Sequence, residues 1–232
     1  MRNPLFPILM SAAMLASCAE QYVVNGSSNV EGLEGKTLYL KVFAGEDMRA
    51  IDSSRVVHGK FRFRGVLDSV TMANVFVDDT SVMPVVLESG EVSLNIGEST
   101  QSATGTPMND SLSQFIQRKT QIDAQMAELP HLESQMIMDG ISLDQISVEL
   151  GAKARALNDE NDRFVSRFIS SNYDNVLGPG IFMIMTSALQ YPILNPKIEA
   201  IISQAPPYFL NHPYVREYIK AAESNMEKMH DY

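Results

Sequence analysis

The sequence predicts an α+β fold, in which an N-terminal antiparallel β-sandwich or barrel-like sheet is followed by an all-helical region with a long helical hairpin. Up to about residue 96, apolar residues alternate with polar ones, which is the spacing of half-buried strands. After Gly105, apolar residues recur at steps of three, four and seven, which is the spacing of amphipathic helices. We therefore divide the chain into a leader (residues 1–17), an antiparallel β domain (18–104) and a helical region packed on or beside the sheet (105–232).

The leader has the features of an export signal peptide. Arg2 is its only charge, and the apolar stretch at 5–15 is shorter than the ~20 residues of a membrane-spanning helix. Residues 15–18 read Leu-Ala-Ser-Cys, which resembles a lipobox, whose cysteine receives lipid. Because Cys18 is the only cysteine of the chain, lipid attachment explains its presence. We expect a lipoprotein of the cell envelope, anchored through Cys18 to the outer membrane and facing the periplasm.

Composition excludes several chemistries. With one cysteine, the chain has no internal disulfide, no Cys-x-x-Cys redox pair and no multi-cysteine zinc site. The 18 Lys and Arg residues face 28 Asp and Glu residues, which gives a formal net charge of −10. This balance argues against nucleic acid as a partner, because proteins bind its phosphates through Lys and Arg.

The β domain is expected to contain about seven short strands joined by tight turns. His58-Gly59 and Ser89-Gly90 are typical of two-residue hairpin turns, in which Gly adopts a positive φ without steric cost. The clearest alternating or apolar segments lie at 22–24, 38–43, 61–64, 75–77, 82–87 and 92–96.

Two long helices are predicted after the strands. The first opens at Thr106-Pro107, where Thr is a typical N-cap and Pro a typical first helical residue. The second starts near Ser142, which has capping-box spacing to Gln145. The segment between them, from Pro130 to Gly140, is expected to be a short break that makes the pair an antiparallel hairpin.

Shorter helices are expected in the C-terminal part of the chain. Asn195-Pro196 and His212-Pro213 each predict a helix start, because Pro fits the first turn of a helix. Gly178-Pro179-Gly180 is interpreted as punctuation between helices and not as a phosphate-binding loop.

The strands and helices are expected to fold as one unit. The helix at 107–129 has an apolar stripe that could cover an apolar face of the sheet, and a sheet of this size alone buries too little surface to be stable. The residues assigned to that face are Phe61, Phe63, Val75, Val77, Leu94 and Ile96.

Six segments of the N-terminal half occur in an order and spacing that identify a family. They are Tyr22 to Gly26, Leu33 to Leu40, Ile51 to Ser53, Gly59 to Gly65, Leu87 to Gly90 and Gly105 to Asn109. Together they resemble the N-terminal domain of unknown function that precedes a thioredoxin-like domain in envelope lipoproteins of Bacteroidetes. The resemblance implies the fold, the envelope location and an accessory role. Because Cys-x-x-Cys is missing, we expect neither the thioredoxin-like domain nor its thiol-disulfide oxidoreductase activity here.

Candidate polar sites are weak. The histidines are widely spaced, so the sequence has no local metal-binding signature, and we expect no metal and no cofactor. Asp78-Asp79-Thr80 could join Glu88 as oxygen ligands for calcium, but a hairpin tip rich in Asp is the interpretation that we favour. The histidines are His58, His131, His212 and His230, and a further acidic group, interpreted as a solvated helix face, is Asp159, Glu160 and Asp162.

Methionine is the least ordinary feature of the composition. The chain has 14 methionines, and flexible Met side chains can adapt to varied apolar ligands or partners, although core filling is the interpretation that we favour. The ones that we single out are Met108, Met126, Met136, Met138, Met183 and Met185.

These observations predict a non-enzymatic lipoprotein that acts as a binding or interaction module. Its expected partners are the membrane, through Cys18, and a protein or an apolar ligand. One alternative is a noncatalytic accessory partner of a thioredoxin-like thiol-disulfide oxidoreductase. Another is a hydrolase whose site is assembled from dispersed Asp, Glu and Ser residues.

Overall fold

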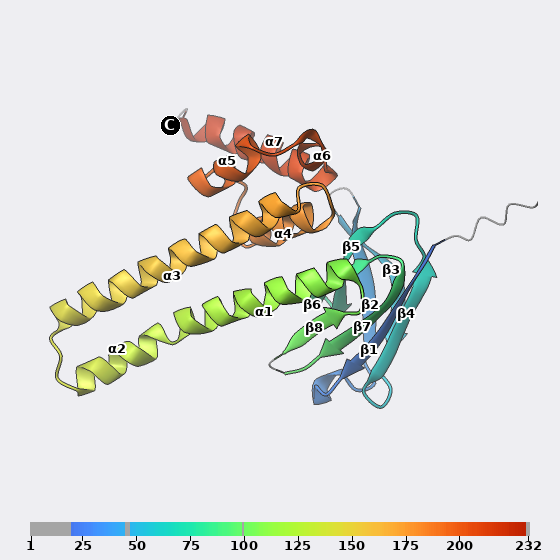
Figure 1. Cartoon of the computed structure of the whole chain (residues 1–232), viewed down its shortest axis with the longest axis horizontal. Coiled ribbons are helices and arrows are strands. Elements are labelled where there is room, and N and C mark those ends of the chain that lie inside the picture. The colour runs from blue at the N-terminus through green and yellow to red at the C-terminus, as the bar shows by residue number, and fades with distance from the viewer. Residues whose placement is uncertain (1–19, 45–46, 99, 231–232) are drawn as a thin grey trace, which may run out of the picture.

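The computed structural model describes residues 20–44, 47–98 and 100–230, so the leader and Cys18 lie outside the described residues (Figure 1). Eight strands in this part of the chain form two four-stranded sheets. The first sheet has the order β4-β1-β7-β8 and the second has the order β3-β2-β5-β6. The strands are β1 (Gln21–Ser28), β2 (Thr37–Ala44), β3 (Asp47–Arg55), β4 (Lys60–Val66), β5 (Thr71–Val77), β6 (Thr80–Leu87), β7 (Gly90–Ile96) and β8 (Gln101–Thr104).

The two sheets pack face to face as a sandwich, and they are not closed into a barrel. Strand pairing is antiparallel except between β1 and β7, which run parallel. The inward-facing residues of both sheets form one apolar core, because alternate residues of each strand point to the same face. That core includes Val24, Leu38, Leu40, Phe61, Phe63, Val75, Val85, Leu94 and Ile96.

Two turns that look alike in sequence differ in the structure. His58 and Gly59 have φ angles of 51° and 66° and form a tight turn that an antiparallel bridge between Val57 and Lys60 closes, although β3 and β4 on either side of it lie in different sheets. Glu34 accepts hydrogen bonds from the backbone N–H groups of both turn residues at 2.9 Å. The predicted hairpin at Ser89-Gly90 is wrong, because β6 and β7 lie in different sheets and do not pair. The segment instead carries the chain from one sheet to the other. Strands β3 and β8 were not among the segments predicted from alternation.

A long helical hairpin projects from the sandwich as an arm (Figure 1). Its helices are α1 (Pro107–Ala127), α2 (Leu129–Met138) and α3 (Leu143–Ser171). The predicted break at 130–140 is wrong in its extent, because most of it is α2, with Pro130 in the first turn, where Pro is tolerated. The turn at the tip ends with Ser142, whose side chain accepts a hydrogen bond from the Gln145 N–H at 3.4 Å, as the capping spacing predicted.

Shorter helices gather beside the base of the arm (Figure 1). They are α4 (Leu177–Ser187), α5 (Pro196–Ser203), α6 (Pro207–Leu210) and α7 (Pro213–His230), besides a short 3-10 helix, η1 (Glu31–Leu33), in the sandwich. The predicted start at Asn195-Pro196 is confirmed, because the Asn195 side chain accepts a hydrogen bond from the Ile198 N–H. Gly178-Pro179-Gly180 does not separate helices: it forms the buried first turn of α4.

A second apolar core joins the helices to the outer face of the second sheet. Met72 of β5 and Val86 of β6 belong to it, together with residues of α1, α3, α4, α5, α6 and α7. Gly180 permits this contact, because a Cβ atom there would lie 1.9 Å from the Sδ atom of Met72. The predicted cover for Phe61 and Phe63 is therefore wrong in detail. The opposite sheet buries those residues, and the helices bury Met72 and Val86.

Side chains from α1 complete the open edges of both sheets. Asn109 accepts from the Val86 N–H at 2.9 Å and donates to the Val86 C=O at 2.8 Å, so its carboxamide takes the place of a neighbouring strand beside β6. One turn later, the Ser113 hydroxyl accepts from the Ala103 N–H and donates to the Ala103 C=O on β8. Each sheet thus has one edge strand, β6 or β8, with a residue whose outward backbone groups are bonded by a side chain of α1.

The start of α1 is held by a carboxylate from the sandwich. Glu88 accepts hydrogen bonds from the backbone N–H groups of Met108 and Asn109, at 3.0 and 3.2 Å. Thr106 occupies the N-cap position, as predicted, but its side chain makes no capping hydrogen bond. Glu88 therefore supplies the acceptor for the first turn of α1. Among the described helices, none is both long enough and apolar enough to cross a membrane.

Candidate functional site

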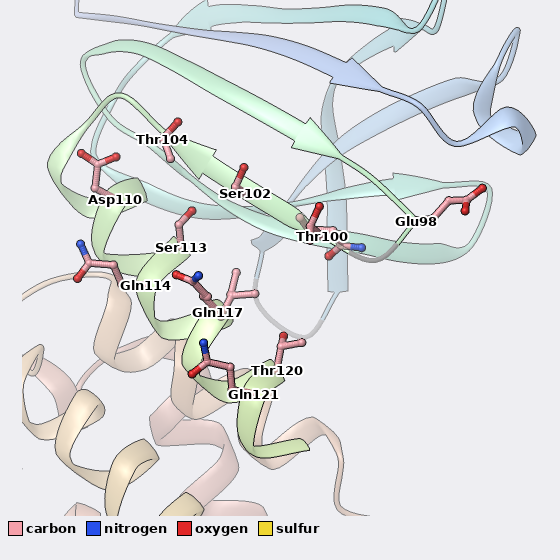
Figure 2. Close-up of a pocket in the computed structure, with 12 residues that line it drawn as sticks. Glu98, Thr100, Ser102, Thr104, Asp110, Ser113, Gln114, Gln117, Thr120 and Gln121 are labelled. Atoms are coloured by element: carbon pink, nitrogen blue, oxygen red, sulfur yellow. The ribbon is translucent and has the colours of Figure 1, made fainter. Parts of the chain in front are cut away.

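A polar cleft of about 760 Å³ lies between the edge strand β8 and helix α1 (Figure 2). Figure 2 shows Thr100, Ser102 and Thr104 along one side and residues of α1 along the other. The full lining is Glu98, Thr100, Gln101, Ser102, Thr104, Asp110, Ser113, Gln114, Ile116, Gln117, Thr120 and Gln121.

The periodicities of strand and helix explain why these side chains meet. Alternate residues of a strand share a face, which places the hydroxyls of Thr100, Ser102 and Thr104 in a row. Residues three or four apart share a helix face, which places Ser113, Gln117 and the neighbouring glutamines opposite that row. The Ser113–Ala103 hydrogen bonds hold the strand and the helix together within the cleft.

Most side chains that line the cleft are uncharged groups that form hydrogen bonds. Five hydroxyl side chains and four carboxamide side chains line it, and each of these groups can both donate and accept. Among the described residues, the lining has two carboxylates, Glu98 and Asp110, and no Lys, Arg or His. One oxygen of Asp110 already accepts from the Gly105 N–H at 3.0 Å. The cleft thus suits a ligand with repeated polar groups that is neutral or carries positive charge.

The structure places the described histidines far from this cleft and in separate elements. His58 lies in the β3–β4 turn, His131 is exposed on α2, and His212 precedes α7. His212 is half-buried, its Nδ1 atom has no hydrogen-bond partner among the described residues, and burial lowers its pKa. The side chain of His230 lies outside the described set. Within the described part of the chain, no group of His, Cys, Asp and Glu could hold a metal ion.

The position of Glu88 contradicts the hypothesis of a calcium site shared with Asp78 and Asp79. Asp78 and Asp79 form the β5–β6 hairpin turn, with Val77 paired to Thr80, whereas Glu88 follows the other end of β6. A strand of eight residues is about 26 Å long, so these carboxylates do not share a site. Asp78 instead pairs with Lys36 at 3.4 Å. The favoured interpretation, a hairpin tip rich in Asp, agrees with this geometry.

The acidic group on α3 has a structural role that the sequence did not indicate. Glu160 pairs with Arg118 of α1, and Asp162 pairs with Lys197 of α5 at 2.7 Å. The first pair joins the two long helices of the arm and the second joins the arm to α5, while Asp159 is exposed as predicted.

The methionines divide between core and surface. Met108 and Met126 are half-buried on α1 and Met136 is half-buried on α2. Met138 at the tip of the arm is 78% exposed. Met185 lines an apolar pocket among the helices, and Met183 lines a smaller one beside Gly180. Packing against other residues therefore accounts for most of these methionines, whereas Met138 is exposed.

Sequence reasoning did not identify the cleft. The α1 residues that line it read as the polar face of an amphipathic helix, and the short strand β8 gave no alternation of apolar residues. The available signal was the glutamine spacing at 114, 117 and 121, together with the hydroxyl residues at 100, 102 and 104.

A family model matches the part of the chain that forms the sandwich and the start of α1. A family model described as a domain of unknown function, DUF4369, matches residues 22–112. The match covers nearly all of the eight-stranded sandwich and ends in α1 after Asn109, the residue that completes the edge of β6. The family resemblance drawn from the sequence is thereby confirmed for the N-terminal domain. A search of the curated proteins finds no match to this chain.

Proposed function

We propose that the protein is a non-catalytic envelope lipoprotein, anchored through Cys18, that binds an extended polypeptide in the cleft between β8 and α1. The observation that carries this proposal is the row of hydroxyls at Thr100, Ser102 and Thr104 opposite the carboxamides of α1. Alternate residues of a strand are about 6.6–6.8 Å apart, which is also the repeat of an extended peptide beside it. Each hydroxyl therefore meets an equivalent peptide group of the ligand.

Two further features favour a polypeptide. A groove between an edge strand and a helix is a recurrent place for peptide recognition. The cleft also has two carboxylates and no cation, so peptides that carry Lys or Arg fit it better than acidic ones. An oligosaccharide is disfavoured because no aromatic ring lines the cleft, and sugar rings commonly stack on aromatic side chains.

The test uses two glutamines of the same helix. A peptide is selected from a random displayed library against the purified protein, and its affinity is measured by calorimetry for Gln117→Trp and Gln125→Trp. Gln117 lines the cleft, whereas Gln125 is exposed one to two turns beyond it. We expect the bulky ring at 117 to abolish binding and the ring at 125 to leave it unchanged. Equal affinity in both variants would contradict the proposal.

The tip of the arm favours a second role, which is docking to a protein partner. Ile137, Met138, Leu143 and Val148 are exposed there, at 49%, 78%, 69% and 71%, and α2 has no buried residue. The segment 120–150 has no Lys or Arg, and its carboxylates are Asp123, Glu128, Glu133, Asp139, Asp144 and Glu149. An apolar tip among carboxylates suits a partner whose apolar groove has a basic rim, and disfavours an anionic membrane or a second tip.

The accessory role beside a thioredoxin-like oxidoreductase is one form of this docking. A photoreactive residue at Val148 should crosslink to that oxidoreductase in cells that contain both proteins, while the same residue at exposed Lys228 on α7 should not. Crosslinking from both positions, or from neither, would contradict this role.

A further inference from the structure

A second concave site lies on the opposite face of α1 from the polar cleft. It is a pocket of about 400 Å³ enclosed by α1, α3, α4 and α5. Phe115 and Lys119 of α1 line it, whereas Ser113, Gln117 and Gln121 line the cleft. At about 100° per residue these two sets lie on opposite sides of the helix. The pocket and the cleft are therefore separate sites that share one helix.

The walls of the pocket are mostly apolar. Its volume is within the range of small-molecule sites, and such sites combine apolar walls with a few polar groups. Met185 is the flexible member of the wall, and an unbranched thioether side chain adapts to the shape of a ligand. The apolar lining is Phe115, Val165, Ile181, Ile184, Met185, Ala188, Leu189 and Ile198.

Four polar side chains line the pocket, and one of them, Asn195, already uses its Oδ1 atom to cap α5. The Oδ1 atom of Asn161 is buried and has no hydrogen-bond partner among the described residues. A buried acceptor without a donor is costly, so a ligand that brings a donor is favoured there. Lys119 and Lys197 reach the pocket from α1 and α5. Lys119 pairs with Asp123, and Lys197 pairs with Asp162. Because an ammonium group has three donors, each lysine can still donate to a ligand.

We propose that this pocket binds a medium-chain aliphatic hydroxy acid. The chain lies among the apolar walls, the carboxylate accepts hydrogen bonds from Lys119 and Lys197, and the hydroxyl donates to Oδ1 of Asn161. A simple fatty acid satisfies the lysines and leaves Asn161 without a donor. A fatty alcohol supplies a donor and leaves the lysines without an anion. Only a ligand with both a carboxylate and a hydroxyl supplies an acceptor for the two lysines and a donor for Asn161.

Methyl resonances of methionine report on the pocket directly. The full chain carrying Cys18→Ser is labelled at the methionine methyl groups and titrated with 3-hydroxydecanoate, decanoate and decanol below their aggregation limits. We expect a saturable shift of the Met185 signal, tightest with the hydroxy acid, and no shift of Met138 at the exposed tip. Equal shifts of both signals, or no saturable shift at about 1 mM, the weak end of specific binding, would overturn the proposal.

Variants separate the two polar contacts. Asn161→Ala should remove the preference for the hydroxy acid over decanoate and leave decanoate binding unchanged. Lys119→Gln with Lys197→Gln should weaken both acids about tenfold or more, the effect of hydrogen bonds to a charged group, and leave decanol unchanged. Far-ultraviolet circular dichroism checks that each variant is folded. A preference that persists in Asn161→Ala would contradict the assigned hydroxyl contact, and equal loss for decanol would contradict the assigned anion contact.

Discussion

Replacing Asn109 by Ala tests how α1 is joined to the sandwich. Asn109 is fully buried, and its carboxamide bonds both the N–H and the C=O of Val86 and also reaches Thr106 and Glu88. The Ala variant leaves the two backbone groups of Val86 buried without partners, and each such group costs about 1–3 kcal/mol. We expect the free energy of unfolding to fall by about 3 kcal/mol. For a domain of this size, that corresponds to a Tm lower by about 6–12 °C.

Chemical denaturation followed by circular dichroism measures this loss, with Asn25→Ala on the exposed face of β1 as the control. Asn109→Asp adds a second test. It keeps an acceptor for the Val86 N–H, removes the donor for the Val86 C=O and sets a second carboxylate beside Glu88. We expect the Asp variant to recover stability as the carboxylates become protonated. A loss in Asn109→Ala no larger than in the control would refute the reasoning that Asn109 joins α1 to the sandwich.

Three further predictions concern other parts of the molecule. Gly180→Ala should cost about 1–3 kcal/mol in a denaturation series, because the new methyl group collides with Met72, and an unchanged midpoint would contradict the close approach. The backbone N–H groups of Gly59 and His58 lower the pKa of Glu34 below its usual 4.5, so its contribution to stability is present above that value and is lost as the pH falls through the folded-state pKa. Glu34→Gln should therefore have a lower free energy of unfolding than the parent near neutral pH, and this difference should shrink as the pH falls. A difference that does not change with pH would contradict the prediction. Met138→Ser should change stability by less than about 0.5 kcal/mol, because the side chain is exposed, and a larger loss would show that the tip packs in solution.

The sandwich was largely predictable because its signal is local. Alternation at 61–64 and 92–96 follows from one buried and one exposed face, and both segments are strands. Strand β3 was missed because it has no apolar alternation: Ile51 is 37% exposed, and the half-buried residues beyond it are Asp52 and Ser54. The pairing of β1 with β7 could not be predicted either, because sheet order depends on contacts between distant segments.

The helix boundaries also divide into those set by neighbouring residues, which were predicted, and those set by distant residues, which were not. Caps such as Ser142 and Asn195 act on neighbouring backbone groups and were predicted correctly. The first turn of α4 was not, because Gly and Pro usually interrupt helices, and only the approach of Met72 explains why Gly180 belongs there. The capping role of Glu88 was also hidden, because this carboxylate lies after β6, far from the start of α1 in the sequence, and replaces the local cap. The polar cleft and the buried side chain of Asn161 could not be predicted, because both depend on how faces of helices pack against elements that are distant in the sequence.

Mapping the bound peptide on the protein tests the central claim most directly. Amide resonances of the full chain carrying Cys18→Ser are followed by nuclear magnetic resonance during titration with the peptide selected from the library. If the cleft binds an extended polypeptide, the largest shifts lie on β8 at 100–104 and on α1 at 113–121, and they saturate together. Shifts confined to the arm tip or to the helices α4–α7, with β8 unaffected, would contradict the claim.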